Sequence, residues 1–377
     1  MEGKRVGVIG GGQLAWMMAA EASKLGIKIV VQTPNQDDPA VSRADDVIFA
    51  ELDDFEGTVK LAQYSDVVTF ENEFIDLKAL YKVKKFGGNA SFYPSLSTLA
   101  PLLDKYDQRD YLKSIGVPVP EFSIYPTKEQ IKSNYGFPVV LKARRHGYDG
   151  QGTFIIKDAE DLEWLAKTVP IEELIVEKYI PFEKELAIIA ARTRSEIAIY
   201  PVTETYQKNQ VCHWTITPAK VTAKVAEEVK DIARKILERL NVVGVFGIEF
   251  FLTADNRVLV NEIAPRTHNS GHYTLDGCHT SQFAMQLQAI TGMSLGSTAL
   301  KSAGAVMVNL LGFEESDSDY LEKRDRILEI PNSFVHWYGK FSRSGRKLGH
   351  ATVVLNEQQL THAKSIIEQI ESIWYEN

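Results

Sequence analysis

Glu249 and Glu262 stand in two apolar runs that a short polar turn at Asp255–Asn256 would join into a β-hairpin. If that turn is the centre of the hairpin, residues pair when their numbers have the same sum, so Leu252 faces Leu259 and Glu249 faces Glu262. Carboxylates that face each other on one side of a sheet repel each other. A hard cation such as Mg²⁺, held together with nucleotide phosphates, would relieve the repulsion. The pattern predicts a metal site, unless the register shifts by one residue or one glutamate points to solvent.

The loop behind this hairpin carries groups that suit an oxyanion. Pro265 ends the second strand, because proline cannot donate to the ladder. Arg266 can hold a planar oxyanion through two parallel hydrogen bonds, and His268 is a base that titrates near neutral pH. Asn269 and Ser270 add hydrogen-bonding groups. Together these residues indicate a catalytic loop, although a single histidine is more often structural.

A lysine and a glycine-rich loop form the second candidate site. Lys142 ends one predicted strand, and the glycine-rich loop at 147–152 leads into the next. Glycines let backbone N–H groups approach phosphate oxygens, and a fixed lysine neutralises their charge. This is not a Walker A loop, because the lysine precedes the glycines and no helix follows. The segment is either a loop that covers a nucleotide between antiparallel strands or a plain hairpin loop. Nearby, Glu177–Ile180 offers an acidic side chain and backbone groups on a strand edge that could hold an adenine.

The N-terminal "VIGGGQLA" has the spacing of an anion-binding turn. Gly10, Gly12 and Ala15 match G-x-G-x-x-[GA] between a strand and a helix, which favours a phosphate or carboxylate at the helix N-terminus. A dinucleotide site also needs an acidic residue at the end of the second strand, where this chain has Gln32. An NAD-dependent dehydrogenase is therefore disfavoured, and a tight turn without a ligand stays open.

A basic stretch near the C-terminal end, "HWYGKFSRSGRKLGH", contrasts with the acidic chain. It contains Lys340, Arg343, Arg346 and Lys347, and its glycines exclude a helix. Most runs of charge are solvated loops. The glycines and the local excess of positive charge favour a phosphate pocket here.

The composition indicates a folded protein with more than one domain. The chain has 377 residues, of which 44% are hydrophobic and 24% charged, and its net charge is −8. This charge disfavours duplex nucleic acid as a partner, and no apolar run approaches the ~18 residues of a membrane-spanning helix. Cys212 and Cys278 make no disulfide framework, so we expect a reducing, cytoplasmic location.

The elements that must position these groups follow from the hydrophobic patterns. Over the first hundred residues, short apolar strands alternate with amphipathic helices, which is typical of a doubly wound parallel sheet. Further on, β-branched segments at hairpin spacing predict antiparallel sheet, and helices are predicted over 102–116, 225–240 and 357–373. The predicted class is α/β and α+β, divided at 1–101, 102–185, 186–300 and 301–377.

In this order the segments resemble the ATP-grasp enzymes and, more closely, the N5-carboxyaminoimidazole ribonucleotide synthetase family of purine biosynthesis. The likeness runs nearly end to end through "GGGQL", "TFENE", "GYDGQG", "EKYI", "NEIAPRTHNSGHYT", "SQF" and "GRKLGH". It implies an N-terminal α/β pre-ATP-grasp domain, a small ATP-grasp domain with a glycine-rich lid, a large one with the metal hairpin, and a small C-terminal β-rich domain. It also implies a homodimer.

The resemblance further implies a ligase reaction. ATP phosphorylates bicarbonate to carboxyphosphate, and the exocyclic amine of 5-aminoimidazole ribonucleotide takes up the carboxyl group. Arg266 and His268 would hold bicarbonate and the carboxylated intermediate. A related ligase that uses formate or glycine on another ribonucleotide is the alternative.

Residue by residue, the resemblance assigns three sets of positions. Glu249 and Glu262 would hold Mg²⁺, and Arg266, His268 and Lys340 would be catalytic. ATP would be bound by Lys105, Lys142, Gly147, Tyr148, Asp149, Gly150, Gln151, Gly152, Thr153, Glu177, Lys178, Tyr179, Ile180, Glu185, Gln207, Asn261 and Glu262. The ribonucleotide and the carboxyl group would be bound by Gln13, Leu14, Glu73, Tyr148, Asn269, Ser270, Lys340, Arg346 and Lys347.

The chain departs from the family pattern at three places. Ala15-Trp16 replaces the Gly-Arg of "GGQLGRM", which removes the arginine that could contact substrate. Ala264 stands where the wider superfamily often has an asparagine, so a second Mg²⁺ would be held less fully. Gln207 stands where some relatives have histidine near ATP.

Overall fold

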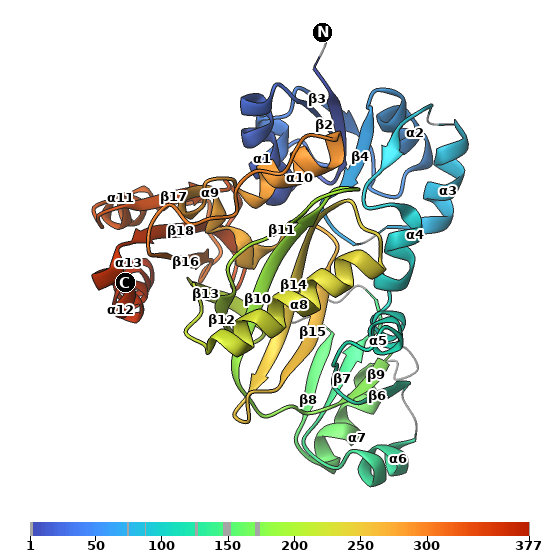
Figure 1. Ribbon diagram of the computed structural model, residues 1–377, viewed down its shortest axis with the longest axis vertical. Coiled ribbons are helices and arrows are strands. Elements are labelled where there is room, and N and C mark those ends of the chain that lie inside the picture. Colours follow the sequence, from blue (N-terminus) through green and yellow to red (C-terminus); the bar gives the residue numbers. More distant parts are fainter. Residues whose placement is uncertain are drawn as a thin grey trace.

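The computed structural model describes residues 3–73, 75–86, 88–124, 127–145, 152–169 and 174–376. In these ranges the strands form three sheets, seen in Figure 1 at the N-terminal end, in the middle and at the opposite end of the molecule. Gly147, Tyr148, Asp149, Gly150 and Gln151, predicted to bind ATP, lie outside the described residues. Within the described ranges, no helix is long and apolar enough to cross a bilayer.

The N-terminal sheet is parallel and doubly wound, as predicted. Its strand order is β3-β2-β1-β4-β5, and its inner strands are apolar because helices cover both faces. Its strands are β1 (Arg5–Ile9), β2 (Lys28–Thr33), β3 (Asp46–Phe49), β4 (Val67–Phe70) and β5 (Ser91–Phe92). Its helical segments are α1 (Gln13–Ala22), η1 (Ser23–Leu25), η2 (Pro39–Ser42), α2 (Phe55–Gln63), α3 (Leu77–Phe86), α4 (Leu96–Leu99) and η3 (Ala100–Leu102).

A small antiparallel sheet follows helix α5 (Lys105–Ser114). This helix begins three residues later than predicted, because the Asp104 side chain accepts the backbone N–H groups of Tyr106 and Asp107. The sheet order is β6-β9-β7-β8, so the strand that contains Glu177 is internal, and the predicted strand edge is wrong. The elements are β6 (Phe122–Ile124), α6 (Lys128–Asn134), β7 (Val139–Ala143), β8 (Thr153–Ile156), α7 (Ala159–Thr168) and β9 (Leu174–Lys178).

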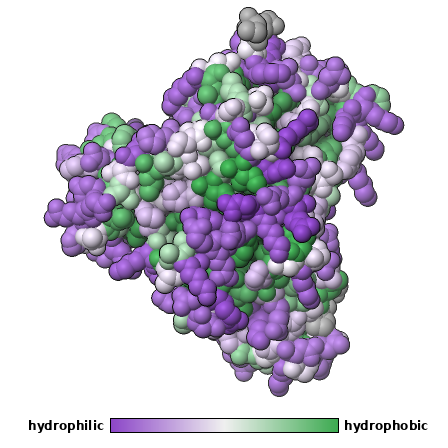
Figure 2. All heavy atoms as spheres, in the orientation of Figure 1, coloured by the Kyte–Doolittle hydropathy of each residue, from purple (hydrophilic) through white to green (hydrophobic). Residues whose placement is uncertain are grey.

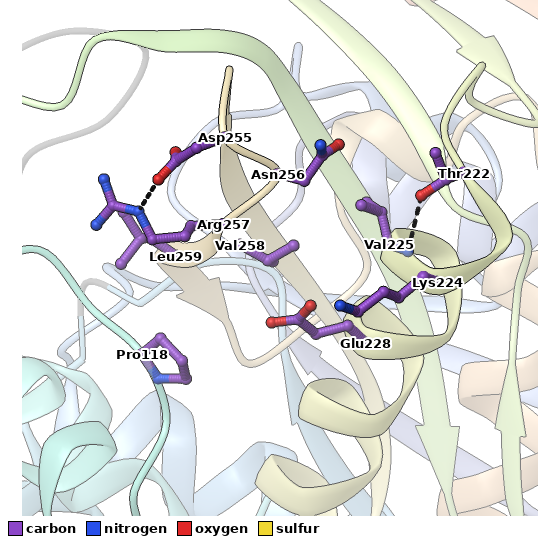
Figure 3. A pocket seen from close by; sticks show the side chains of 10 residues that line it. All are labelled: Pro118, Thr222, Lys224, Val225, Glu228, Asp255, Asn256, Arg257, Val258 and Leu259. Carbon is purple, nitrogen blue, oxygen red and sulfur yellow. Dashed lines mark hydrogen bonds and ion pairs between the residues drawn. The ribbon is translucent and has the colours of Figure 1, made fainter.

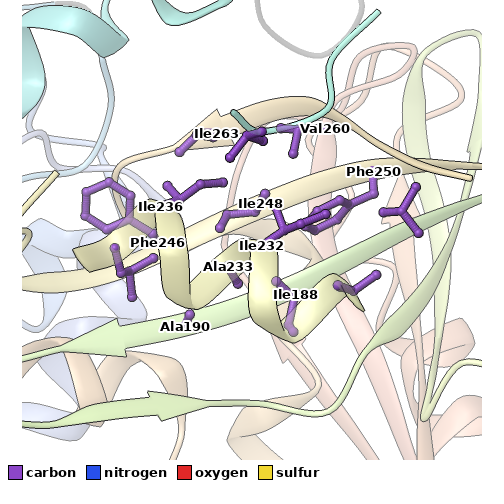
Figure 4. Close-up of a cluster of buried hydrophobic side chains, with 14 of the residues drawn as sticks. Ile188, Ala190, Ile232, Ala233, Ile236, Phe246, Ile248, Phe250, Val260 and Ile263 are labelled. Atoms are coloured by element: carbon purple, nitrogen blue, oxygen red, sulfur yellow. The ribbon is translucent and has the colours of Figure 1, made fainter. Parts of the chain in front are cut away.

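The large sheet carries the predicted glutamate hairpin. Helix α8 (Ala223–Arg239) lies across it, and Figure 4 shows Ile232 and Ile236 of this helix packed on Ile248 and Phe250. The intervening Glu249 therefore points to the opposite face of the sheet. The strands here are β10 (Phe182–Arg192), β11 (Ile197–Ile199), β12 (Thr203–Lys208), β13 (Val211–Thr217), β14 (Gly244–Thr253) and β15 (Val258–Ala264).

The C-terminal strands extend this same sheet, because β13 pairs with β16. The single helix predicted over 357–373 is broken at His362, whose backbone (φ −115°, ψ 23°) leaves the helical region. The elements are η5 (Asn269–Gly271), α9 (Thr274–Gly277), α10 (Gln282–Thr291), β16 (Gly304–Leu311), α11 (Leu321–Leu328), β17 (Ser333–Trp337), β18 (Lys347–Leu355), α12 (Glu357–Thr361) and α13 (Ala363–Tyr375). Helix α10 packs beside α1 on the N-terminal sheet, which ties the first and last thirds of the chain together.

Candidate active site

The two glutamates of the hairpin face each other, as predicted. Glu249 pairs with Glu262, but nearer the turn Leu252 pairs with Val258 and not with Leu259. The register shifts between these pairs, and the extra residue on β15 is Asn261. The predicted register near the turn was wrong by one residue, and the bulge restores the glutamate pair.

This carboxylate pair is compensated only in part by positive charge. Burial raises the pKa of Glu249 to about 8, and the negative charges of Glu262 and Glu185 add to the shift. Burial also opposes the ionisation of Glu262, but Lys105, whose Nζ lies 2.9 Å from its Oε1, lowers its pKa below the ordinary value. In the described ranges no group of three or more His, Cys, Asp or Glu side chains could hold a metal ion. Two hard oxygen donors with an unmet charge fit Mg²⁺ that takes its other ligands from phosphates and water.

A buried ion network lies beside the hairpin. The Glu177 carboxylate bonds Arg109 Nε at 2.7 Å and Lys142 Nζ at 2.9 Å. Lys142 also donates to Asn261 Oδ1 at 3.0 Å, so the bulged residue is held by the predicted ATP lysine. Burial opposes the charge of Glu177, but Arg109 and Lys142 outweigh it and lower its pKa to about 2. The side chain of Glu177 is thus committed to these two cations, and any contact it makes with a nucleotide would run through its backbone.

The remaining predicted ATP positions surround this network. Burial raises the pKa of Glu185 to about 7, although Lys142 opposes the shift. Lys178 is exposed and lies 3.5 Å from Glu121, and Tyr179 and Ile180 follow it, half-buried.

The described end of the glycine loop is held by main-chain contacts. Gly152 has φ +80°, which favours glycine, and its carbonyl accepts the Ala143 N–H.

Gln207, predicted to lie near ATP, is at a register shift in β12. Gln210, which sequence reasoning missed, donates from Nε2 to the Thr153 carbonyl at 3.1 Å.

Arg266 and His268 are fixed at the rim of the glutamate pair. Arg266 contacts Glu73 at two points, Nε to Oε1 at 3.0 Å and Nη2 to Oε2 at 3.1 Å, so a predicted catalytic residue and a predicted substrate-binding residue lie against each other. His268 Nε2 lies 3.6 Å from Glu249 Oε1, and its Nδ1 lies 2.8 Å from Ser270 Oγ.

The backbone of His268 is clamped by a residue of the "SQF" motif. Gln282 accepts the His268 N–H at 2.9 Å and donates to its carbonyl at 2.7 Å. Gly247 allows this close approach, since a Cβ there would lie 2.4 Å from the His268 Cβ. The "SQF" motif was part of the family resemblance, but no role was predicted for Gln282.

Asn269 does not present a free amide. Its Nδ2 donates to Asn309 Oδ1 at 2.9 Å, and Asn309 Nδ2 donates back at 2.8 Å. Both residues are buried. The side chain predicted to bind substrate is therefore engaged with β16.

The N-terminal glycine turn holds a carboxylate of the chain itself. The backbone N–H groups of Gly12 and Leu14 donate to Glu71 at 2.6 and 3.0 Å. The prediction of a ligand anion at the N-terminus of α1 is wrong, because Glu71 occupies the place that a pyrophosphate would take. This geometry also disfavours the dinucleotide alternative. The Leu14 side chain, predicted to bind substrate, is part of the apolar core.

The predicted phosphate-binding cations lie beside this turn. Lys340 Nζ contacts Gln13 Oε1, and burial lowers the pKa of Lys340 to about 8 although Glu71 opposes the shift. Arg346 donates to the Phe341 carbonyl at 3.1 Å, and burial lowers its pKa. Lys347 begins β18.

Trp16, which replaces the arginine of the family pattern, is covered by another guanidinium. Arg43 lies 3.9 Å from the centre of its ring, and Trp16 meets Tyr338 edge to face at 6.0 Å. A cation is thus present near this position, from a different part of the chain.

A groove lies away from these residues. It has a volume of about 670 Å³ and lies between α8 and the tip of the hairpin, lined by Lys224, Glu228 and Arg257 among others (Figure 3). It contains none of the predicted site residues. Figure 2 shows that hydrophilic side chains predominate on this face of the molecule, with smaller hydrophobic patches between them.

Known families match this chain in sequence order. The model of the ribonucleotide synthetase preATP-grasp domain matches residues 3–100, and that of the ATP-grasp domain matches residues 110–283. The model of the phosphoribosylaminoimidazole carboxylase C-terminal domain matches residues 305–364.

Individual relatives cover almost the whole chain. The N5-carboxyaminoimidazole ribonucleotide synthase of Synechocystis sp. is 52% identical across 98% of this chain and 98% of its own. The solved N5-carboxyaminoimidazole ribonucleotide synthetase of Thermotoga maritima is 40% identical across 98% of both chains, with a TM-score of 0.87. The Aspergillus clavatus N5-carboxyaminoimidazole synthase, solved with ADP and 5-aminoimidazole ribonucleotide, is 30% identical across 99% of this chain and 98% of its own, with a TM-score of 0.90.

The fold and the glutamate hairpin define an ATP-grasp enzyme, which is an ATP-dependent ligase. The chain belongs to the N5-carboxyaminoimidazole ribonucleotide synthase family. The predicted fold class and family are therefore confirmed.

Proposed function

We propose that this chain carboxylates 5-aminoimidazole ribonucleotide with bicarbonate and ATP in purine biosynthesis. A bicarbonate oxygen attacks the γ-phosphorus of ATP, the bond to the ADP oxygen breaks, and carboxyphosphate forms. The exocyclic amine then attacks the carboxyl carbon, the bond from that carbon to the phosphate oxygen breaks, and the amine loses a proton. The products are N5-carboxyaminoimidazole ribonucleotide, ADP and phosphate.

One observation carries the proposal: the facing pair Glu249 and Glu262 adjoins a fixed arginine and a fixed histidine. An ATP-dependent phosphorylation needs a place for phosphate charge, and a carboxyl transfer needs an oxyanion site within reach of it. The relative solved with ADP and 5-aminoimidazole ribonucleotide supports an adenine nucleotide and this ribonucleotide as ligands of the site.

Glu249 and Glu262 would hold Mg²⁺, which when bound neutralises phosphate charge and aligns the transferred group. Lys105 and Lys142 would bind the triphosphate. Both already lie within hydrogen-bond distance of acidic or amide oxygens at the hairpin, so their positive charge is in place before the substrate arrives.

Arg266 and His268 would handle the carboxyl group. The guanidinium is planar and already makes a two-point contact with Glu73, so bicarbonate or carboxyphosphate can take the place of that carboxylate. His268, oriented by Ser270 and Gln282, would hold the carboxylated intermediate and accept the amine proton. Displaced Glu73 would then be free to bond the aminoimidazole.

The reaction can be tested by its requirements. ADP formation should depend on bicarbonate and be stimulated by 5-aminoimidazole ribonucleotide, and ¹⁴C from bicarbonate should appear in the product. Because carbamates lose CO₂ in acid, the fixed ¹⁴C must be measured at alkaline pH. Stimulation by formate or glycine in place of bicarbonate would support the alternative ligase and overturn this proposal.

We further propose that the enzyme requires Mg²⁺, acts in the cytoplasm and is a homodimer, with the domain divisions given above. These proposals rest on the family resemblance. Light scattering in solution that gave only the 42.3 kDa of one chain would contradict the dimer. Full activity in the presence of excess EDTA would contradict the metal.

Replacing Lys340 should weaken ribonucleotide binding selectively. Lys340→Ala removes a largely buried cation at the predicted phosphate pocket, so KM for the ribonucleotide should rise roughly 10- to 100-fold, as for about 1.5–3 kcal/mol of charged hydrogen bond. KM for ATP should change little. Lys224→Ala is the control, because Lys224 lines the groove between α8 and the hairpin tip, away from the predicted site residues. Equal effects on both KM values would place Lys340 elsewhere.

The pH dependence of ribonucleotide binding should follow the same lysine. Burial lowers the pKa of Lys340 to about 8, so its charge is present below pH 8 and is lost above it. KM for the ribonucleotide should therefore rise between pH 8 and 9.5, where the substrate phosphate (pKa about 6) is already a dianion. Lys340→Arg stays charged and should abolish the rise. The same rise in that variant would refute the assignment.

A further inference from the structure

Three polar side chains stand in a row across the C-terminal part of the large sheet. His350 of β18 lies directly opposite Asn309 of β16 and His336 of β17. Residues that are opposite each other project from the same face of a sheet. The rings of His336 and His350 are stacked, with centroids 4.6 Å apart. Asn309 and His350 are buried, so this row is not a solvated surface.

A second polar row lies on top of the first. Asn269, His272 and Asp276 recur every three to four residues along η5 and α9, the spacing of one side of a helical segment. Each of them meets one residue of the sheet row. Asn269 and Asn309 exchange hydrogen bonds at 2.9 and 2.8 Å, the rings of His272 and His350 lie 4.9 Å apart, and Asp276 Oδ2 lies 2.8 Å from His336 Nε2. We name these six residues the polar seam.

The seam joins the two halves of the candidate site. The segment that carries Asn269, His272 and Asp276 follows the loop of Arg266 and His268 directly in the sequence. On the other side, His350 lies three residues after Lys347, and its Nδ1 lies 2.6 Å from the Tyr338 hydroxyl. Lys340 follows Tyr338 by two residues, and its Nζ lies 5.6 Å from the centre of that ring.

The contacts in the seam require particular partners. Each asparagine amide satisfies the other, so losing one would leave buried polar groups unpaired, at a cost of about 1–3 kcal/mol for each group. Burial lowers the pKa of both His272 and His350, which keeps the rings neutral. The hydrogen bond between His350 Nδ1 and the Tyr338 hydroxyl also fixes the orientation of the Tyr338 ring. The paired asparagines, the Asp276–His336 contact and the His350–Tyr338 contact each require one alignment of the two segments, whereas Nε2 of His272 and of His350 has no hydrogen-bond partner among the described residues.

We propose that the polar seam is a positioning device for the carboxyl transfer, which holds the Arg266–His268 loop in alignment with the strands that carry Lys340 and Lys347. This inference rests on the proposed function. Phosphorylation of bicarbonate uses the glutamate hairpin, Lys105, Lys142 and the Arg266–His268 loop, whereas carboxyl transfer also needs the ribonucleotide held at the correct distance. Loosening the seam should therefore uncouple ADP formation from carboxylation, since a displacement of about 1 Å can cost roughly 100-fold in rate.

The test compares ADP formed with ¹⁴C fixed in three variants of the full chain, at a saturating concentration of 5-aminoimidazole ribonucleotide. His350→Leu removes the hydrogen-bond partner of Tyr338 and the ring contact with His272, and the ratio of fixed carbon to ADP should fall at least about tenfold. His350→Asn places an amide oxygen near the position of Nδ1, so it should recover most of the ratio. Thr352→Val is the matched control, because Thr352 is equally buried, projects from the same face one step along β18, and its hydroxyl forms no hydrogen bond with the described residues.

Each outcome decides the proposal. A wild-type ratio in His350→Leu, or a loss of ADP and product in equal proportion, would overturn it. If circular dichroism shows that His350→Leu is unfolded, Asn309→Asp replaces it. That variant keeps the size of the side chain but loses the Nδ2 group that donates to Asn269 and to the Cys212 carbonyl, and the same fall in the ratio is expected. Absence of bicarbonate-dependent product in the wild-type protein would refute the proposed function instead.

Discussion

Glu262→Gln should reduce turnover by at least about 10²–10³-fold while the protein stays folded. The change removes one of the two facing carboxylates that fit Mg²⁺, and charge placed at a developing transition state is usually worth that much. It also relieves the repulsion that helps to raise the pKa of Glu249, which offsets the loss of the ion pair with Lys105. Steady-state kcat and the midpoint of thermal unfolding are the measurements.

The control for this prediction is Glu228→Gln, the same chemical change in the groove on the α8 side of the sheet. It should leave kcat unchanged. Turnover of Glu262→Gln within a few-fold of wild type would refute the metal assignment. A large fall in its unfolding midpoint would show instead that Glu262 serves the fold.

The hairpin shows how far sequence reasoning reaches. The Glu249–Glu262 pairing was predicted from the position of the turn, and it is correct only because the bulge at Asn261 cancels a one-residue error nearer the turn. A three-residue turn, in which Asn256 has φ +59°, shifts the register, and the extra residue in β15 shifts it back. The spacing of apolar residues predicts which side chains share a face of a strand. A bulge depends instead on contacts with distant parts of the chain, such as the hydrogen bond from Lys142 to Asn261.

The N-terminal turn shows a different limit. The parallel sheet was predicted correctly, because alternating apolar strands and amphipathic helices leave few other arrangements. The spacing of Gly10, Gly12 and Ala15 also indicated an anion at the start of α1, and an anion is there. That anion is Glu71, which the local pattern cannot reveal because it lies at the end of β4, about 60 residues away.

The functional residues that were not predicted from the sequence also depend on partners elsewhere in the chain. Arg109 and Asn309 bond partners 68 and 40 residues away, and Gln282 of the "SQF" motif bonds His268 14 residues away, so no short motif predicts these contacts. The predicted residues are those whose type suits a ligand. The missed residues are those that hold the predicted ones in place.

Glu177→Gln should destabilise the small sheet by about 3–5 kcal/mol. The variant keeps the size of the side chain but leaves Arg109 and Lys142 buried without their counter-ion, and breaking a buried pair in this way is costly. Hydrogen exchange of amides in β7 and β9 should rise accordingly, and the thermal midpoint should fall. Glu163→Gln, which breaks the exposed pair with Lys128, should cost less than about 1 kcal/mol.

The pH dependence of stability separates the charge of Glu177 from its shape. The buried cations lower its pKa to about 2, below the ordinary value of 4.5, so its stabilisation is fully present above pH 4.5 and is lost as the pH falls toward 2. Wild-type protein should therefore lose stability over this range more steeply than Glu177→Gln, and the two should converge in acid. Parallel curves for the two proteins between pH 5 and 2 would mean that the charge of Glu177 does not stabilise the fold, and that the buried network is held together by packing.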